Sequence, residues 1–173
     1  MPLRRLDVNL PDDALTVSWE LPHPRETVWS HLQNPETLRE WLGRPLVFDT
    51  RIGGEIIIDH ADDYLCRSEV LSVSEFESAL SWTFPDEPSS RISLSLSAAD
   101  PTEQTEDVEV AAENATVLTL EHFGLGPLIE SYATGWLTHL TFFEASLNGT
   151  PLPDSQFWPI CATVDRLIGN HRN

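Results

Sequence analysis

One stretch of apolar periodicity near the carboxyl end constrains the fold more than any other feature. Between residues 128 and 147, large apolar side chains recur every three or four positions, at Ile129, Tyr132, Trp136, Leu140, Phe143 and Leu147. This spacing predicts a helix roughly 30 Å long, at about 1.5 Å per residue, with one apolar face. A helix of that length needs a broad apolar surface to cover it, so we expect it to lie on a sheet.

Length and composition indicate one domain with a substantial core, because the chain has 173 residues of which 40% are hydrophobic. No apolar run approaches the ~18 residues of a membrane span, and no apolar stretch follows the arginines at positions 4 and 5. We therefore expect a cytoplasmic protein that makes no membrane contact. The two cysteines, Cys66 and Cys161, lie far apart and predict neither a disulfide framework nor a metal-ligand pair.

The charge balance excludes several classes of partner and reaction. Acidic residues number 28 against 10 basic ones, and the net charge of −18 repels phosphate backbones and anionic lipid surfaces. We expect no nucleic-acid partner. Every basic residue is an arginine, and the absence of lysine excludes Schiff-base chemistry and the phosphate-binding lysine of a P-loop.

Short segments of period-2 alternation precede the long helix and predict antiparallel strands. The clearest is residues 91–98, where Ile92, Leu94 and Leu96 face one way and serines face the other. Further strands are predicted at residues 15–21, 46–49, 56–60, 64–76, 80–84 and 116–123. Two short helices are predicted at residues 24–33 and 34–42, the second with Asn34 as its N-cap and Gly43 beyond its end.

The predicted domain organisation has one folded unit with two flanking segments. Residues 1–14 form an N-terminal extension, 15–149 the domain, and 150–173 a C-terminal tail whose amphipathic pattern is that of a short helix. Residues 100–114 form an acidic hairpin insertion with six acids, no base and no periodicity able to bury a face. A solvated loop is the more frequent outcome for such a segment, and a docking arm is the alternative.

The order of these elements predicts an α+β helix-grip fold, with a curved antiparallel sheet of about six to seven strands wrapped around the long C-terminal helix and two short helices after the first strand. Several short motifs in this order resemble the START-like (SRPBCC) superfamily, closest to the branch named after the activator of the heat-shock-protein-90 ATPase. They are Val28-Trp29, Pro35-Glu36 through Trp41-Leu42, Ile52-Gly53-Gly54-Glu55, Leu80-Ser81-Trp82, residues 116–123, Gly135-Trp136 and Leu147-Asn148-Gly149. The resemblance covers residues 15 to 149.

This resemblance implies a hydrophobic ligand held between the long helix and the sheet, and in a minority of members catalysis in the same cavity. It does not imply chaperone stimulation, because in the eukaryotic namesake that activity depends largely on a separate N-terminal domain for which this chain has no room.

A cavity between helix and sheet can be drawn from the residues that face it. We expect it to bind a small hydrophobic or aromatic molecule, and its predicted lining is Ile58, Trp82, Leu94, Leu96, Leu118, Leu120, His122, Tyr132, Trp136, Leu140 and Phe143. The alternative is that these side chains fill the space as an ordinary core.

Two further alternatives stay open at this point. His60 and His122 fall at the apolar parity of their strands, so a cyclase, lyase or hydrolase could use either as acid or base, although a hydrogen-bonded core histidine is commoner. A protein-interaction module, chaperone-associated or otherwise, could dock through the sheet exterior, the acidic insertion or the tail. A homodimer could bury Phe157, Trp158 and Leu167. No metal-ligand motif is present, and we expect no metal and no cofactor.

Overall fold

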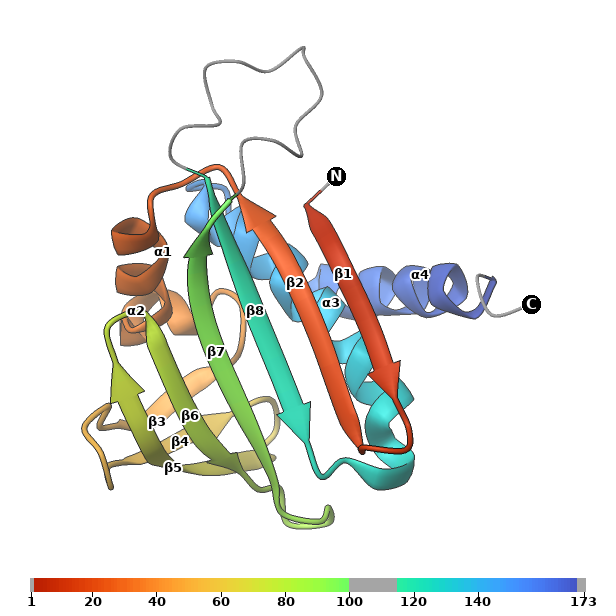
Figure 1. The fold of residues 1–173 in the computed structure, drawn as a ribbon, viewed down its shortest axis with the longest axis horizontal. Coiled ribbons are helices and arrows are strands. Elements are labelled where there is room, and N and C mark those ends of the chain that lie inside the picture. Colours follow the sequence, from red (N-terminus) through yellow and green to blue (C-terminus); the bar gives the residue numbers. More distant parts are fainter. Residues whose placement is uncertain (1, 100–114, 171–173) are drawn as a thin grey trace.

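The computed structural model describes residues 2–99 and 115–170 and contains one curved, fully antiparallel sheet around a long helix (Figure 1). The sheet has eight strands in the order β1-β2-β8-β7-β6-β5-β4-β3. Their bounds are β1 Leu3–Asn9, β2 Ala14–Leu21, β3 Arg44–Phe48, β4 Glu55–Asp59, β5 Leu65–Ser74, β6 Glu77–Trp82, β7 Ser90–Ala98 and β8 Thr116–Phe123. The helices are α1 Arg25–Leu32, α2 Pro35–Leu38, α3 Ile129–Leu147 and α4 Phe157–Asn170, with short 3₁₀ turns at Gly126–Leu128 and Asp154–Gln156. The predicted α+β helix-grip fold is confirmed.

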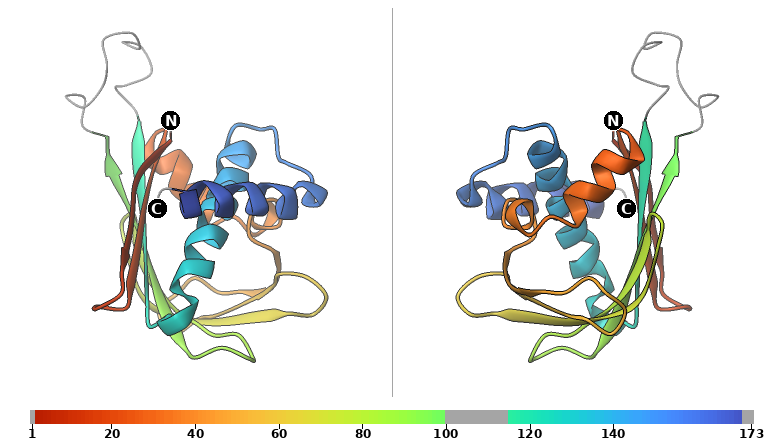
Figure 2. Two further views of the ribbon diagram at one scale, coloured as in Figure 1. Left: turned by 90° about the vertical axis from the view of Figure 1, so that its right-hand side faces the viewer. Right: turned by 90° about the vertical axis from the view of Figure 1, so that its left-hand side faces the viewer.

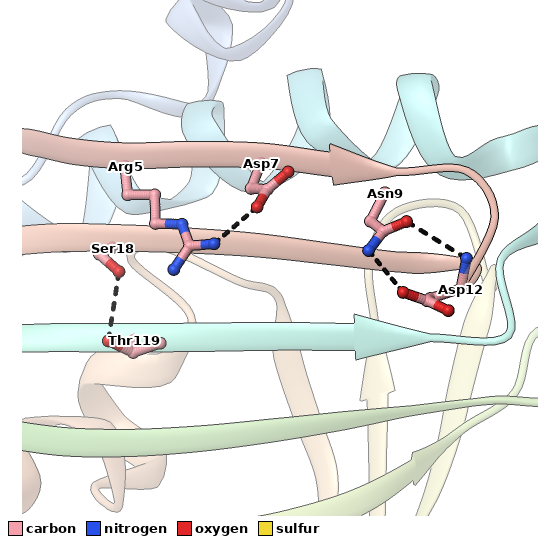
Figure 3. Close-up of polar contacts among 6 residues, drawn as sticks. All are labelled: Arg5, Asp7, Asn9, Asp12, Ser18 and Thr119. Carbon is pink, nitrogen blue, oxygen red and sulfur yellow. Dashed lines mark hydrogen bonds and ion pairs between the residues drawn. The ribbon is translucent and has the colours of Figure 1, made fainter.

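The centre of the sheet buries one face and leaves the other polar. Burial alternates residue by residue along β2 and β8, and the inner apolar residues meet across strands, with Leu120 opposite both Val17 and Leu94. On the outer face Ser18 and Thr119 share a hydrogen bond of 3.3 Å between their hydroxyls (Figure 3). This outer face is mostly polar along these two strands, and all the described helices pack on the inner side (Figure 2).

The strand count corrects the expectation of six to seven strands. Residues predicted to form an N-terminal extension instead supply β1, an edge strand paired antiparallel with β2. The sequence conceals this strand because its register shifts between Leu3 and Arg5, so the inward side chains of Leu3, Leu6 and Val8 do not alternate strictly. Polar residues of β1 face the outer side of the sheet, where Arg5 and Asp7 form an ion pair (Figure 3).

Helix α3 is buried on two sides, which explains why its sequence is apolar over more than one stripe. One side lies on the sheet, and α4 crosses the other side (Figure 2). Thr134 donates a hydrogen bond to Asp165 of α4 over 3.3 Å, and the ring of Phe142 lies 5.7 Å from that of Phe157. The tail therefore carries a 14-residue helix that packs against the long helix.

Helices α1 and α2 also lie on the inner side of the sheet, where α1 contacts β7 and α2 contacts β3. Asn34 caps α2 as expected, since its side-chain oxygen accepts the amide N–H of Glu36 at 2.9 Å. After α2 the chain turns into β3 through Gly43, where a Cβ atom would lie 2.7 Å from the carbonyl oxygen of Asp59. This close approach joins the α2 turn to the end of β4.

Gly135 lies in α3 with open space around it, because a Cβ atom there would meet nothing within 4 Å. A mid-helix glycine often marks a close approach, but here the structure provides none. We expect Gly135→Ala to raise the free energy of unfolding by about 0.5–1 kcal/mol, since alanine loses less backbone entropy in a helix. Urea denaturation of the two proteins measures this, and a destabilised alanine variant would contradict it.

The predicted acidic insertion at residues 100–114 lies outside the described residues. Within residues 2–99 and 115–170, no helix is long and apolar enough to cross a bilayer.

Candidate functional site

An apolar cavity of about 80 Å³ lies between α3 and the inner face of the sheet. The helix contributes Trp136 and Leu140, and the central strands contribute Leu118 and Leu120 from β8 and Leu94 from β7. The remaining walls come from the curled half of the sheet and from α1, α2 and the turn after α2. They are Trp29, Leu32, Gln33, Leu38, Trp41, Leu42, Phe48, Thr50, Ile56, Ile58, Ser68, Val70, Val73, Ser78, Leu80, Trp82 and Ile92.

This cavity differs from an ordinary core because close packing leaves few spaces larger than a water molecule. Its walls are almost wholly carbon, and only Gln33, Thr50, Ser68 and Ser78 bring polar side chains to them apart from the indole nitrogens. An apolar cavity of about 150 Å³ binds benzene, so a one-ring guest would enter this smaller space only if the walls moved outward.

The structure brings most of the predicted lining residues together around this space. Ile58, Trp82, Leu94, Leu118, Leu120, Trp136 and Leu140 line it. Four others do not. Leu96 is buried in the core, Phe143 packs between the rings of His31 and Trp41, and His122 and Tyr132 belong to a hydrogen-bonded group beside the cavity. Each of these four lies on the same face of its strand or helix as the lining residues, but at a position along that element that does not reach the cavity.

His122 is fully buried, and both of its ring nitrogens are engaged. The indole N–H of Trp136 donates to Nδ1 over 3.0 Å, and Nε2 lies 2.8 Å from the hydroxyl of Ser90. Because Ser90 donates its own proton to the carbonyl of Trp82 at 3.1 Å, Nε2 must carry the hydrogen. Burial lowers the pKa of His122 to about 3, so this ring is neutral at pH 7 and holds α3 to β7 and β8.

Tyr132 continues this polar group toward the surface. Its hydroxyl donates to the carboxylate of Glu87 and accepts the indole N–H of Trp82 at 3.3 Å. Burial, followed by the hydrogen bond to Glu87 and that carboxylate's charge, raises the pKa of Tyr132. The indole nitrogens of Trp82 and Trp136 are thus both satisfied by protein groups at one end of the cavity.

Two further histidines, His60 and His139, lie where α3 passes the end of β4. Their rings are 5.9 Å apart, and Nδ1 of His139 donates to the carbonyl of Trp41 at 2.7 Å. Burial is the largest cause that lowers the pKa of both, to about 3 for His60. His60 contacts the rings of Trp82 and Phe84. Both histidines are therefore uncharged at neutral pH, and neither is among the residues that line the cavity.

Sequence reasoning missed the wall formed by the two short helices, the turn after them and β3. Trp29, Leu38, Trp41 and Leu42 fall within the two predicted short helices, but nothing in their spacing indicates which surface they cover. Phe48 falls within the predicted strand at residues 46–49. The curl of the sheet decides this, because it brings the β3–β4 end around to face α3 (Figure 2).

A second hollow lies on the opposite side of α3, between the edge strand β1 and α4. This groove has a volume of about 600 Å³ and is lined by Pro2, Leu3, Leu6, Val8, Trp19, Leu137, Thr141, Val164, Leu167 and Ile168. Leu167 is 57% exposed, and Trp158 at the start of α4 is 75% exposed. Phe157 instead packs against the rings of His139 and Phe142. A homodimer contact through the tail stays a prediction.

Among the described residues, no three His, Cys, Asp or Glu side chains lie close enough together to hold a metal ion.

Comparison with known proteins shows the fold and no more. No protein-family model matches the sequence, and no curated protein does either. Among solved structures, CalU16 from Micromonospora echinospora matches with a TM-score of 0.67 and 18% identity, over 89% of this chain and 84% of its own. Ms6760 from Mycobacterium smegmatis matches with a TM-score of 0.67 and 16% identity, over 86% and 96%.

A third match is DynU16, a protein of the dynemicin biosynthetic locus, with a TM-score of 0.67 and 22% identity over 82% of this chain. The present chain spans about half of DynU16, since the match covers 49% of that protein. At these identities the comparisons establish a shared helix-grip architecture.

Proposed function

We propose that this protein binds a small apolar or aromatic molecule in the cavity between α3 and the sheet. The observation that carries the proposal is the apolar space of about 80 Å³ at a place where close packing is the rule. The helix-grip fold typically holds hydrophobic ligands in this position. The START-like resemblance of residues 15 to 149 supports the same site and adds no chaperone activity.

Binding without turnover has more support than catalysis. Both ring nitrogens of His122 are engaged, so it could accept a proton only by breaking its bond with Trp136. His60 does not line the cavity, and burial lowers its pKa to about 3. A base with so low a pKa is weak at neutral pH. None of the described residues that line the cavity carries a carboxylate or an imidazole.

Ethylbenzene is a suitable first probe, because it is one aromatic ring with a short apolar arm. We expect it to bind and to change the intrinsic fluorescence, since four of the six tryptophans, Trp29, Trp41, Trp82 and Trp136, line the cavity. Val70 is 2% exposed and lines the cavity from β5. Val70→Phe should fill the space and weaken ethylbenzene binding at least tenfold.

The matched control is Val8→Phe, which places the same added volume in the groove beside β1. This variant should bind ethylbenzene as the wild type does. Loss of binding in Val8→Phe with retention in Val70→Phe would move the guest to the groove and refute the proposal, as would the absence of any binding in the wild type.

A further inference from the structure

Trp41 lines the cavity and carries a buried indole N–H that no group among the described residues accepts. Three indoles that are buried to the same degree line the space, with 6% of Trp41 exposed and 3% each of Trp82 and Trp136. The N–H of Trp82 donates to Tyr132 and that of Trp136 donates to His122. No acceptor among the described residues reaches Nε1 of Trp41, although that atom is buried.

The rest of Trp41 is firmly held, so this donor has a defined position. Its amide N–H donates to the carbonyl of Leu38 at 3.3 Å, and its own carbonyl accepts from His139 at 2.7 Å. Its ring packs edge-on against Phe143, with ring centroids 5.0 Å apart and planes inclined by 75°. A buried donor without an acceptor is unfavourable by an amount comparable to a lost hydrogen bond, and an acceptor on a guest would relieve this.

From this difference among the three indoles we infer that the cavity's guest carries a neutral hydrogen-bond acceptor, such as a ketone, aldehyde or ether oxygen, that accepts the indole N–H of Trp41. This inference rests on the proposed function and specifies the chemical class of the guest. A carboxylate is the wrong acceptor, because the lining residues that the structure describes include no arginine or histidine to neutralise it and burying an unpaired charge is strongly unfavourable. The guest is therefore an aromatic or apolar carbonyl compound or ether of roughly one-ring size.

Acetophenone and ethylbenzene test the inference, because they share their shape and differ in a carbonyl oxygen. Removing the carbonyl from water weakens acetophenone binding in every variant, so the informative quantity is the ratio of the two affinities. We expect Trp41→Phe to lower the acetophenone-to-ethylbenzene ratio about five- to tenfold relative to the wild type. Trp19→Phe is the matched control, since Trp19 is as buried as Trp41, donates its N–H to Glu144 at 3.0 Å and is not among the residues that line the cavity, and it should leave the ratio unchanged. Titration calorimetry of the full chain measures the affinity of each compound for the wild type, for Trp41→Phe and for the control variant.

A second measurement uses only the wild-type protein, so it does not require that any variant folds. In ¹⁵N-labelled protein, the Trp41 indole proton resonance should move downfield with acetophenone and stay in place with ethylbenzene. Binding of both compounds with an unchanged ratio and an unmoved resonance would overturn the inference and leave the proposed function standing. Failure of both compounds to bind would overturn the proposed function and the inference together.

Discussion

Replacing Phe143 with alanine should lower the free energy of unfolding by about 3–5 kcal/mol, the range for deleting a fully buried phenylalanine side chain. Phe143 is 0% exposed, and its ring meets His31 of α1 at 5.4 Å and Trp41, which follows α2, at 5.0 Å. Its removal leaves a hole where α3 contacts both short-helix segments. Urea denaturation at pH 7 measures the loss.

Phe123 provides the matched control for this substitution. It is half-buried at the end of β8, where the guanidinium of Arg91 lies 5.0 Å from the centre of its ring. Phe123→Ala should lower the free energy of unfolding by no more than about 1–2 kcal/mol, because less area leaves water on folding. Equal losses in the two variants would contradict the role assigned to Phe143 in joining the helices.

Replacing His122 with glutamine should flatten the dependence of stability on pH. A histidine in the unfolded chain has a pKa near 6.5, whereas burial lowers the pKa of folded His122 to about 3. Between these values the unfolded chain binds a proton that the folded protein does not, so stability falls as the pH falls. The loss is about 1.4 kcal/mol per pH unit for one such histidine, or about 2 kcal/mol between pH 6.5 and pH 5.

Glutamine suits this test because it does not titrate and its amide has both an acceptor oxygen and an N–H donor, the two roles that neutral His122 fills toward Trp136 and Ser90. The wild type should therefore lose about 2 kcal/mol more than His122→Gln when the pH is lowered from 7 to 5. Comparing the two proteins removes two other effects of acid, the titration of the remaining histidines and the reduction of the net charge of −18. Parallel pH profiles for the two proteins would refute the assignment of a neutral, doubly engaged ring.

The elements with a regular period were predictable from the sequence. The alternation of Ile92, Leu94 and Leu96 corresponds to β7, and the three-to-four spacing from Ile129 to Leu147 corresponds to α3. Such periods report directly which side of an element is apolar, and an apolar side must be covered. The helix-grip fold followed from that requirement, and so did the part of the cavity wall that α3 and the central strands supply.

Other features required the three-dimensional arrangement. The irregular register of β1 conceals a strand, since Leu3 is out of step with Leu6 and Val8. Parity placed His122 on the inner face but could not reveal that both its nitrogens would be engaged.

What the sequence by itself determined is the set of apolar faces, and from them the fold. Only the tertiary structure decided which faces meet and where they fail to fill the space between them. That outcome depends on how far the sheet curls and on how the turn after α2 carries Trp41 toward α3. The curvature of the sheet accumulates from the small twist between successive strands, and the approach of Trp41 to α3 depends on segments far apart in the sequence. A local hydrophobic period contains no information about either. A cavity with one unsatisfied indole is therefore a property of the folded chain.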